Sequence, residues 1–87
     1  MKYLPAVVGV AVVGDHRLRL LFDDGTVGDA DFSGRTWTGV LEPLTDPAYF
    51  ARVKVDAEAA TIVWPDGLDM APEALYEEAR KHPLIAA

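Results

Sequence analysis

The stretch ATIVWPDGLDMAPEALYEEARK, residues 60–81, predicts a strand, a turn and a helix in close succession. Its β-branched and aromatic start, Thr-Ile-Val-Trp, is typical of a strand. The Pro-Asp-Gly of residues 65–67 ends that strand, because proline cannot donate to a ladder and Asp-Gly favours a turn. Pro72 suits the first turn of a helix, where N–H groups have no intrahelical partner, and Pro83 closes the helix.

The charges along this helix agree with its dipole. Glutamates favour its amino-terminal half and basic residues its carboxyl end: Glu73, Glu77 and Glu78 against Arg80, Lys81 and His82. Asp69, just upstream, is a candidate N-cap. Leu75 and Ala79 form a thin apolar stripe, which Tyr76 widens. We therefore expect the helix to cover one face of a sheet through this stripe.

Three strands are expected before residue 33, at residues 7–13, 17–22 and 26–32. In the first hairpin, a two-residue loop would place Ala11 opposite Leu18. A longer loop would align three valines with the apolar face of the second strand, namely Val8, Val10 and Val12 with Leu18, Leu20 and Phe22. We favour the longer loop because it buries more apolar surface.

Charge decides the register of the second hairpin. A two-residue loop would place Leu20 opposite Asp29, which mixes apolar and acidic partners on one face. A three-residue loop, residues 23–25, instead creates two ion pairs, Arg17 with Asp31 and Arg19 with Asp29. Gly25 then takes the left-handed backbone conformation, which glycine adopts without a Cβ penalty. The sequence therefore predicts the three-residue loop, and the ion pairs select the register more than they stabilise it.

The remaining residues complete an α+β domain. Residues 33–39 predict a loop, Asp46 caps a short helix, and alternating valines mark a strand over residues 52–56. We expect a single domain, residues 1–87, with a small, mostly antiparallel sheet of about five strands. The C-terminal helix packs on one face, and the short helix lies between strands three and four. The tail after Pro83 is expected to fray.

Composition limits the classes of function. The 87 residues carry a formal charge of −6 and no cysteine, which excludes disulfides, thiolate catalysis and cysteine-ligated metals. Eight scattered Lys and Arg residues argue against direct binding to nucleic acid, which requires clustered basic side chains. The apolar run of residues 7–13 is too short to cross a membrane, and no signal peptide is visible. We therefore expect a cytoplasmic protein.

Several short motifs, in the right order, resemble those of one bacterial family. Residues 18–34, LRLLFDDGTVGDADFSG, contain a strand that ends in Phe, an Asp-Gly turn, and a strand that ends in Asp and an apolar residue. The rest of the pattern lies within residues 41–79, at Leu44, Asp46, Phe50, Trp64-Pro65-Asp66-Gly67, Asp69, Pro72, Glu73, Leu75 and Tyr76. Over most of its length the chain resembles the domain-of-unknown-function 2442 family (DUF2442). Ala71, before the helix proline, departs from the family pattern.

The resemblance implies binding partners, and it implies no particular catalysed reaction. The family has no assigned catalytic residues to carry over. Some relatives look like fusions to a helix-turn-helix DNA-binding domain, and others lie beside a second small protein, an arrangement similar to toxin–antitoxin pairs. This chain ends soon after its helix, so we expect no fused DNA-binding module in it.

We expect no enzyme activity and no metal or cofactor site. The acidic residues of the second hairpin are explained by its turn and its ion pairs: Asp23, Asp24, Asp29 and Asp31. A second acidic group lies near a helix start, where carboxylates are stabilising: Asp66, Asp69 and Glu73. Two histidines and the one serine belong to no metal or nucleophile motif: His16, His82 and Ser33.

The loop of residues 33–39 carries two interaction candidates, Arg35 and Trp37, residue types that are enriched at interface hot spots. An exposed Trp37 would mark a partner surface, whereas a buried one would anchor the loop. Tyr3 and Tyr76 are expected at the edges of the core.

The leading hypothesis is a non-enzymatic protein–protein interaction or regulatory module, antitoxin-like, that binds another small protein encoded nearby. The alternative is a nucleic-acid-associated transcriptional regulator that acts with a partner or as a dimer. A third hypothesis, a small-ligand enzyme, requires polar groups that converge in a pocket. Open strand edges also leave room for a homodimer.

Overall fold

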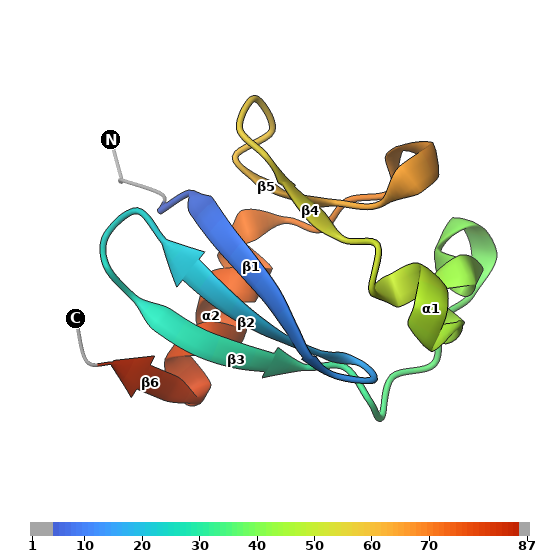
Figure 1. Cartoon of the computed structure of the whole chain (residues 1–87), viewed down its shortest axis with the longest axis horizontal. Helices are drawn as coiled ribbons and strands as arrows, with labels where there is room; N and C mark the ends of the chain where they lie inside the picture. Colours follow the sequence, from blue (N-terminus) through green and yellow to red (C-terminus); the bar gives the residue numbers. More distant parts are fainter. Residues whose placement is uncertain (1–4, 86–87) are drawn as a thin grey trace.

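Two antiparallel sheets organise residues 5–85, the part of the chain that the computed structural model describes. The elements in chain order are β1 (Val7–Gly14), β2 (Arg17–Phe22), β3 (Val27–Asp31), η1 (Gly39–Thr45), α1 (Pro47–Phe50), β4 (Lys54–Asp56), β5 (Thr61–Val63), η2 (Pro65–Gly67), α2 (Pro72–Lys81) and β6 (Pro83–Ile85). One sheet has the order β1-β2-β3-β6, and β4 pairs with β5 in a separate hairpin (Figure 1). The expected α+β class, with a C-terminal helix and a short helix between the third and fourth strands, is confirmed.

The helix α2 crosses one face of the four-stranded sheet, behind β2 and β3 in Figure 1. It buries Leu75 and Ala79 there, as the apolar stripe predicted. At β3 the helix backbone comes very close, since a Cβ built on Gly28 would lie 2.1 Å from the carbonyl oxygen of Ala79. Glycine is therefore the residue that lets α2 pack on this strand.

The second hairpin has the predicted three-residue register. Arg17 pairs with Asp31 and Arg19 with Asp29, with N–O distances of 3.2 and 2.9 Å. Gly25 has φ of 91°, the left-handed conformation that its place in the loop requires.

The first hairpin follows the favoured longer alignment in part. Val12 lies opposite Leu18 and Val10 opposite Leu20, as expected. The third pair was wrong, because an irregularity in β1 between residues 7 and 9 puts Val7, and not Val8, opposite Phe22. An inserted residue of this kind turns the side chains beyond it to the other face. Val7 is therefore buried, and Val8 is exposed.

The core joins the two sheets to the helices and to the loop after β3. Its centre is Trp64, whose indole N–H donates to the carbonyl of Phe50 (2.8 Å). The ring centroids of these two residues lie 5.7 Å apart. The other buried apolar side chains are Val7, Leu18, Leu20, Phe22, Ala30, Phe32, Trp37, Leu44, Ile62, Leu75 and Ala79. Phe50 thus links α1 to the end of β5 through both its backbone and its ring.

Two sequence expectations are corrected at the ends of α2. The N-cap is Ala71 and not Asp69, and no side chain caps this end; the backbone of Asp69 instead bridges to Val63. After the helix, residues 83–85 form β6 and pair with β3, so they do not fray. The N–H of Asp29 donates to the carbonyl of His82 (3.2 Å), which draws this tail onto the sheet. Tyr3 and residues 86–87 lie outside the described part of the chain.

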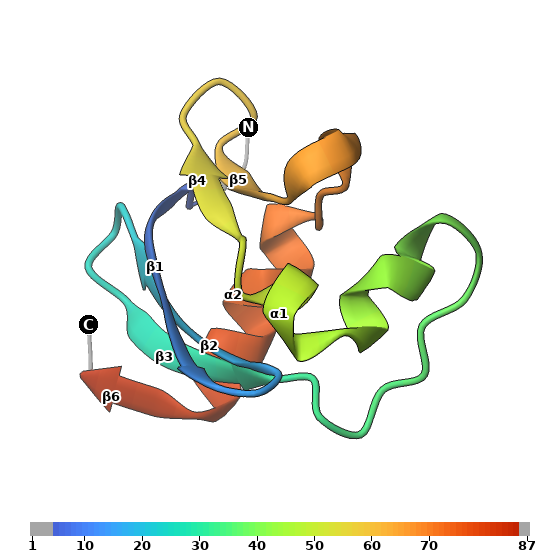
Figure 2. The same ribbon diagram turned by 45° about the vertical axis from the view of Figure 1, so that its right-hand side comes forward.

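The segment that carries η1 and α1 lies at the opposite end of the molecule from β6 (Figures 1 and 2). His16, in the first hairpin, fixes it to the sheet. The His16 ring donates from Nε2 to the carbonyl of Leu44 (2.7 Å), and its centroid lies 4.8 Å from that of Phe50. This contact fixes the end of the loop at η1, and β3 fixes its other end in the sheet.

Candidate functional site

The loop between β3 and η1 is anchored by a buried tryptophan. Trp37 is 7% exposed, and its ring centroid lies 5.9 Å from that of Phe32. Of the two alternatives for this residue, the structure shows the buried one, in which the indole holds the loop against the core.

Arg35 is exposed and stacks on this aromatic pair. Its guanidinium carbon lies 5.0 Å from the ring centroid of Phe32 and 5.4 Å from that of Trp37, within the range of cation–π attraction. Three residues therefore form one unit, the Arg35 platform: Phe32, Arg35 and Trp37. The two aromatic rings hold the guanidinium of Arg35 in a fixed place, although arginine is otherwise a mobile side chain.

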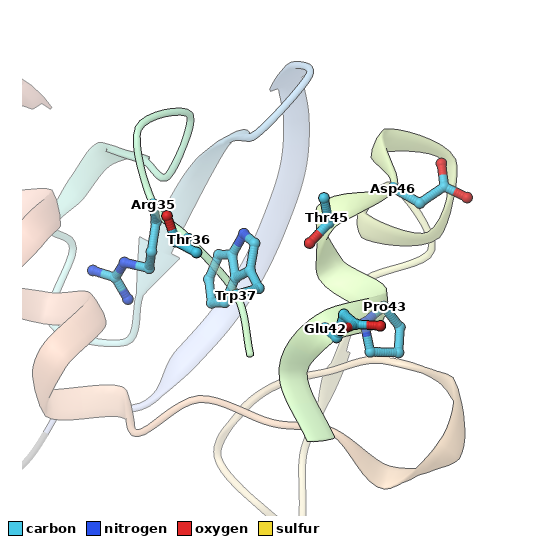
Figure 3. Close-up of a pocket in the computed structure, with 7 residues that line it drawn as sticks. All are labelled: Arg35, Thr36, Trp37, Glu42, Pro43, Thr45 and Asp46. Atoms are coloured by element: carbon cyan, nitrogen blue, oxygen red, sulfur yellow. The ribbon is translucent and has the colours of Figure 1, made fainter. Parts of the chain in front are cut away.

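The first of two grooves beside the platform separates it from η1. This tryptophan groove has a volume of about 680 Å³ and is lined by Arg35, Thr36, Trp37, Glu42, Pro43, Thr45 and Asp46. Figure 3 shows the indole nitrogen of Trp37 and the hydroxyl of Thr45 on facing sides of it, with the Asp46 carboxylate turned away. That carboxylate accepts the N–H of Ala48 (2.9 Å) and so caps α1. The buried Nε1 of Trp37 has no hydrogen-bond partner among the residues described.

The second groove lies between the platform and the first turns of α2. This helix groove has a volume of about 320 Å³ and is lined by Phe32, Arg35, Leu41, Asp69, Met70, Ala71, Ala74, Leu75, Glu77 and Glu78. Its floor is apolar, and its rim carries three carboxylates and one guanidinium. Glu78 also pairs with Lys81 (3.3 Å). Because Arg35 lines both grooves, the platform is the wall between them, and in Figure 3 its guanidinium extends away from η1.

The acidic residues of the second hairpin are occupied within the fold. Asp24 accepts the hydroxyl of Tyr76 (2.6 Å) and the N–H of Thr26 (2.9 Å), and these bonds lower the pKa of its carboxyl. Hydrogen bonds from Ser33, followed by Arg17, lower the pKa of Asp31 to about 2. The bond from Arg19 likewise lowers the pKa of Asp29. Turn and ion-pair roles therefore account for these carboxylates, as the sequence predicted.

The histidines and Ser33 lie in separate places. His16 packs on Phe50, His82 follows the last turn of α2, and the N–H of Ser33 donates to Asp31 (2.9 Å). Over residues 5–85, no three His, Cys, Asp or Glu side chains gather into a metal-binding group. Among the helices described, none is long and apolar enough to cross a membrane.

Sequence reasoning found two residues of the platform but missed the helix groove. Its lining comes from three separated stretches of the chain, residues 32–35, residue 41 and residues 69–78, and the last of these includes two small residues, Ala71 and Ala74. The signal in the sequence that could have revealed the groove was the presence of small residues beside glutamates on a helix whose apolar stripe is thin.

Residues 7–81 match the family model described as "Protein of unknown function (DUF2442)". The chain belongs to this family. The match runs from β1 to the last residue of α2, so both grooves of this DUF2442 protein lie within the matched region. No curated protein and no solved structure matches it significantly.

Proposed function

We propose that this DUF2442 protein is a non-enzymatic, cytoplasmic module that binds another small protein, as an antitoxin-like regulatory subunit does. The observation that carries the proposal is the helix groove, an apolar floor beside a fixed arginine and a rim of carboxylates. Protein interfaces favour this combination of an apolar centre and a polar rim, with arginine and aromatic residues among their hot spots.

The groove contains the features that an anchoring side chain needs. Met70 and Leu75 supply an apolar floor, and Ala74 contributes only a methyl group to the lining. Met is an adaptable contact for a partner, because its unbranched chain fills irregular gaps. An apolar side chain of the partner would occupy this floor.

The rim selects the charge of the partner. Asp69, Glu77 and Glu78 give three carboxylates, against the guanidinium of Arg35 and the ammonium of Lys81 that pairs with Glu78, and the whole chain carries −6. A partner segment with Lys or Arg beside its apolar anchor complements this rim, and its association would be faster at low salt. The proposed partner is therefore a basic protein segment.

A capture experiment with paired variants tests this proposal. Tagged protein is used to capture partners from its own cells, with and without nuclease, for the natural sequence, for Glu77→Lys at the groove, and for Glu58→Lys in the β4–β5 turn. Both variants make the same charge change at an exposed site. We expect one small basic protein that survives nuclease, is lost with Glu77→Lys and is retained with Glu58→Lys.

Other outcomes contradict the proposal. A partner that both variants retain does not use the helix groove. Partners that nuclease removes would favour the nucleic-acid-associated regulator instead. If no protein is captured under any condition, the interaction module is wrong.

A further inference from the structure

The four-stranded sheet has two edges that differ sharply in protection. At one edge, β6 has three residues and begins with Pro83, which has no N–H to offer. At the other, β1 has eight residues, VVGVAVVG, without a charge or a proline. Proteins that remain monomeric protect their sheet edges with charged residues, prolines or very short strands. By this measure β6 is protected and β1 is not.

Hydrogen bonding in the neighbouring strand shows which groups of β1 face outward. The N–H and C=O of Phe22 both bond toward β3, to Thr26 and Gly25. Because backbone groups alternate along an antiparallel strand, Leu21 and Arg19 must face β1. Their partners on β1, Gly9 and Ala11, therefore face β2.

The backbone groups of Val10 and Val12 consequently point out of the sheet. Nothing within residues 5–85 pairs with these N–H and C=O groups, since β1 has a single strand neighbour in its sheet. The hairpin β4–β5 covers the edge near Val7, whose N–H donates to the carbonyl of Ala60 (3.1 Å). The open part of the edge thus begins after Val7.

The side chains of this edge are also apolar and accessible. Val8, Val12 and Val13 are 51%, 42% and 38% exposed. Together with the unpaired backbone groups, they make β1 a template for another strand.

We propose that β1 pairs in antiparallel fashion with β1 of a second copy of this chain, with Ala11 on the two-fold axis. Val10 of each copy then lies opposite Val12 of the other, and both pairs exchange their outward N–H and C=O groups. The two four-stranded sheets become one continuous sheet. The paired region runs from Gly9 to Val13 and stops short of Val7, whose N–H is already bonded to Ala60 of the β4–β5 hairpin.

Charge favours a second copy as the occupant. Residues 7–14 contain no charged side chain, so antiparallel pairing with themselves sets no like charges opposite each other. A foreign strand with alternating charges would leave those charges over exposed valines. The register centred on Ala11 is also the symmetric one that uses the outward groups of both Val10 and Val12. A two-fold interface requires this kind of self-complementary surface.

Cysteine cross-linking tests both the dimer and its register. The chain has no cysteine, so Ala11→Cys introduces one thiol per copy. At a non-hydrogen-bonded antiparallel pair, the Cα atoms lie about 4.5 Å apart, within the range that a disulfide spans. We expect Ala11→Cys to form a disulfide dimer under mild oxidation, whereas Ala48→Cys on α1, also exposed, stays monomeric on a gel run without reductant. Equal cross-linking of the two variants would overturn the register.

Sedimentation velocity over a range of concentrations tests the association itself. We expect the natural sequence to reach twice the monomer mass. Val12→Lys, in the centre of the edge, should weaken dimerisation at least about tenfold, because lysine protects an edge from pairing. Val40→Lys adds the same charge at an exposed site on η1 and should leave the dimer intact. A natural sequence that stays monomeric at all concentrations overturns the proposal, as does a dimer that Val12→Lys leaves intact.

Discussion

The backbone of Ala79 lies so close to Gly28 that a Cβ on the glycine would meet three atoms of Ala79, at 2.1, 2.7 and 2.8 Å. These atoms belong to the helix backbone, which cannot move aside as the end of a flexible side chain can. Helix α2 and strand β3 are therefore held at a separation that only glycine permits.

The first prediction is that Gly28→Ala destabilises the protein strongly. The added methyl group must push α2 from the sheet, and overpacking of this kind costs about 3 kcal/mol or more when backbone has to move. Gly34→Ala is the matched control, because a Cβ there meets nothing within 4 Å. Its effect should stay within about 1 kcal/mol. Urea unfolding of both variants checks this, and similar stabilities would contradict the close approach.

A second prediction compares the two buried tryptophans. The indole N–H of Trp64 is bonded to Phe50, while that of Trp37 has no partner among the described residues. Substitution by phenylalanine removes similar volume at each site, but only at Trp64 does it also remove a buried hydrogen bond, which leaves the Phe50 carbonyl with the longer bond from the N–H of Val53 (3.4 Å) alone. We expect Trp64→Phe to cost about 1–2 kcal/mol more than Trp37→Phe in thermal or urea unfolding. Equal losses would show that the N–H of Trp37 is also bonded.

The parts of the fold that sequence reasoning predicted are those set by local chemistry. Arg17 and Arg19 have acidic partners in only one of the two registers, and Gly25 supplies the left-handed conformation that this loop requires. The same reasoning failed at Val8, where β1 is irregular beside Val7, whose N–H donates to the carbonyl of Ala60, just before β5. A contact between segments more than fifty residues apart leaves no local pattern.

The candidate site shows the same division. Arg35 and Trp37 stand out in the sequence as residue types of interfaces, yet the burial of Trp37 follows from Phe32 and the core around it. The helix groove depends on the position of α2, which Gly28 and Ala79 determine. Neither the groove nor the pairing of β6 with β3 could be predicted from the sequence, because both depend on where α2 packs on the sheet.

The third prediction concerns Tyr76 and the acid stability of the second hairpin. Its hydroxyl is the main cause that lowers the pKa of Asp24 below the ordinary 3.8. A lowered folded-state pKa contributes stability that is present above pH 3.8 and is lost as pH falls through the lowered value. Tyr76→Phe should therefore raise the pKa of Asp24, and its stability deficit should shrink at acid pH. NMR titration checks this, and the control is Tyr49→Phe, which removes a hydroxyl that donates to the carbonyl of Pro65 and not to Asp24.

A fourth prediction uses Asp31, whose pKa lies at about 2 because of the hydrogen bonds from Ser33 and the pairing with Arg17. This carboxylate stabilises the fold above its unfolded pKa of 3.8, and the contribution disappears as pH falls from 3.8 towards 2. Asp31→Asn should lower stability at neutral pH and flatten its decline over that interval. Asp15→Asn, with the same charge change in an exposed turn, should leave the decline in place. An Asp31 carboxyl that titrates near 3.8 would contradict the geometry.

The last prediction separates the proposed dimer from nucleic-acid binding by the sign of its salt dependence. Each copy carries −6, so two copies repel each other while the uncharged β1 strands pair. Added salt screens the repulsion, since the Debye length falls from about 10 Å at 0.1 M to about 3 Å at 1 M. The dimer should therefore tighten several-fold as salt rises, whereas binding to nucleic acid weakens steeply. Sedimentation at low and high salt measures the change, and Val40→Lys, with less repulsion, should tighten the dimer at low salt. Association that weakens with salt would mean that charged surfaces, and not the valine edge, hold the copies together.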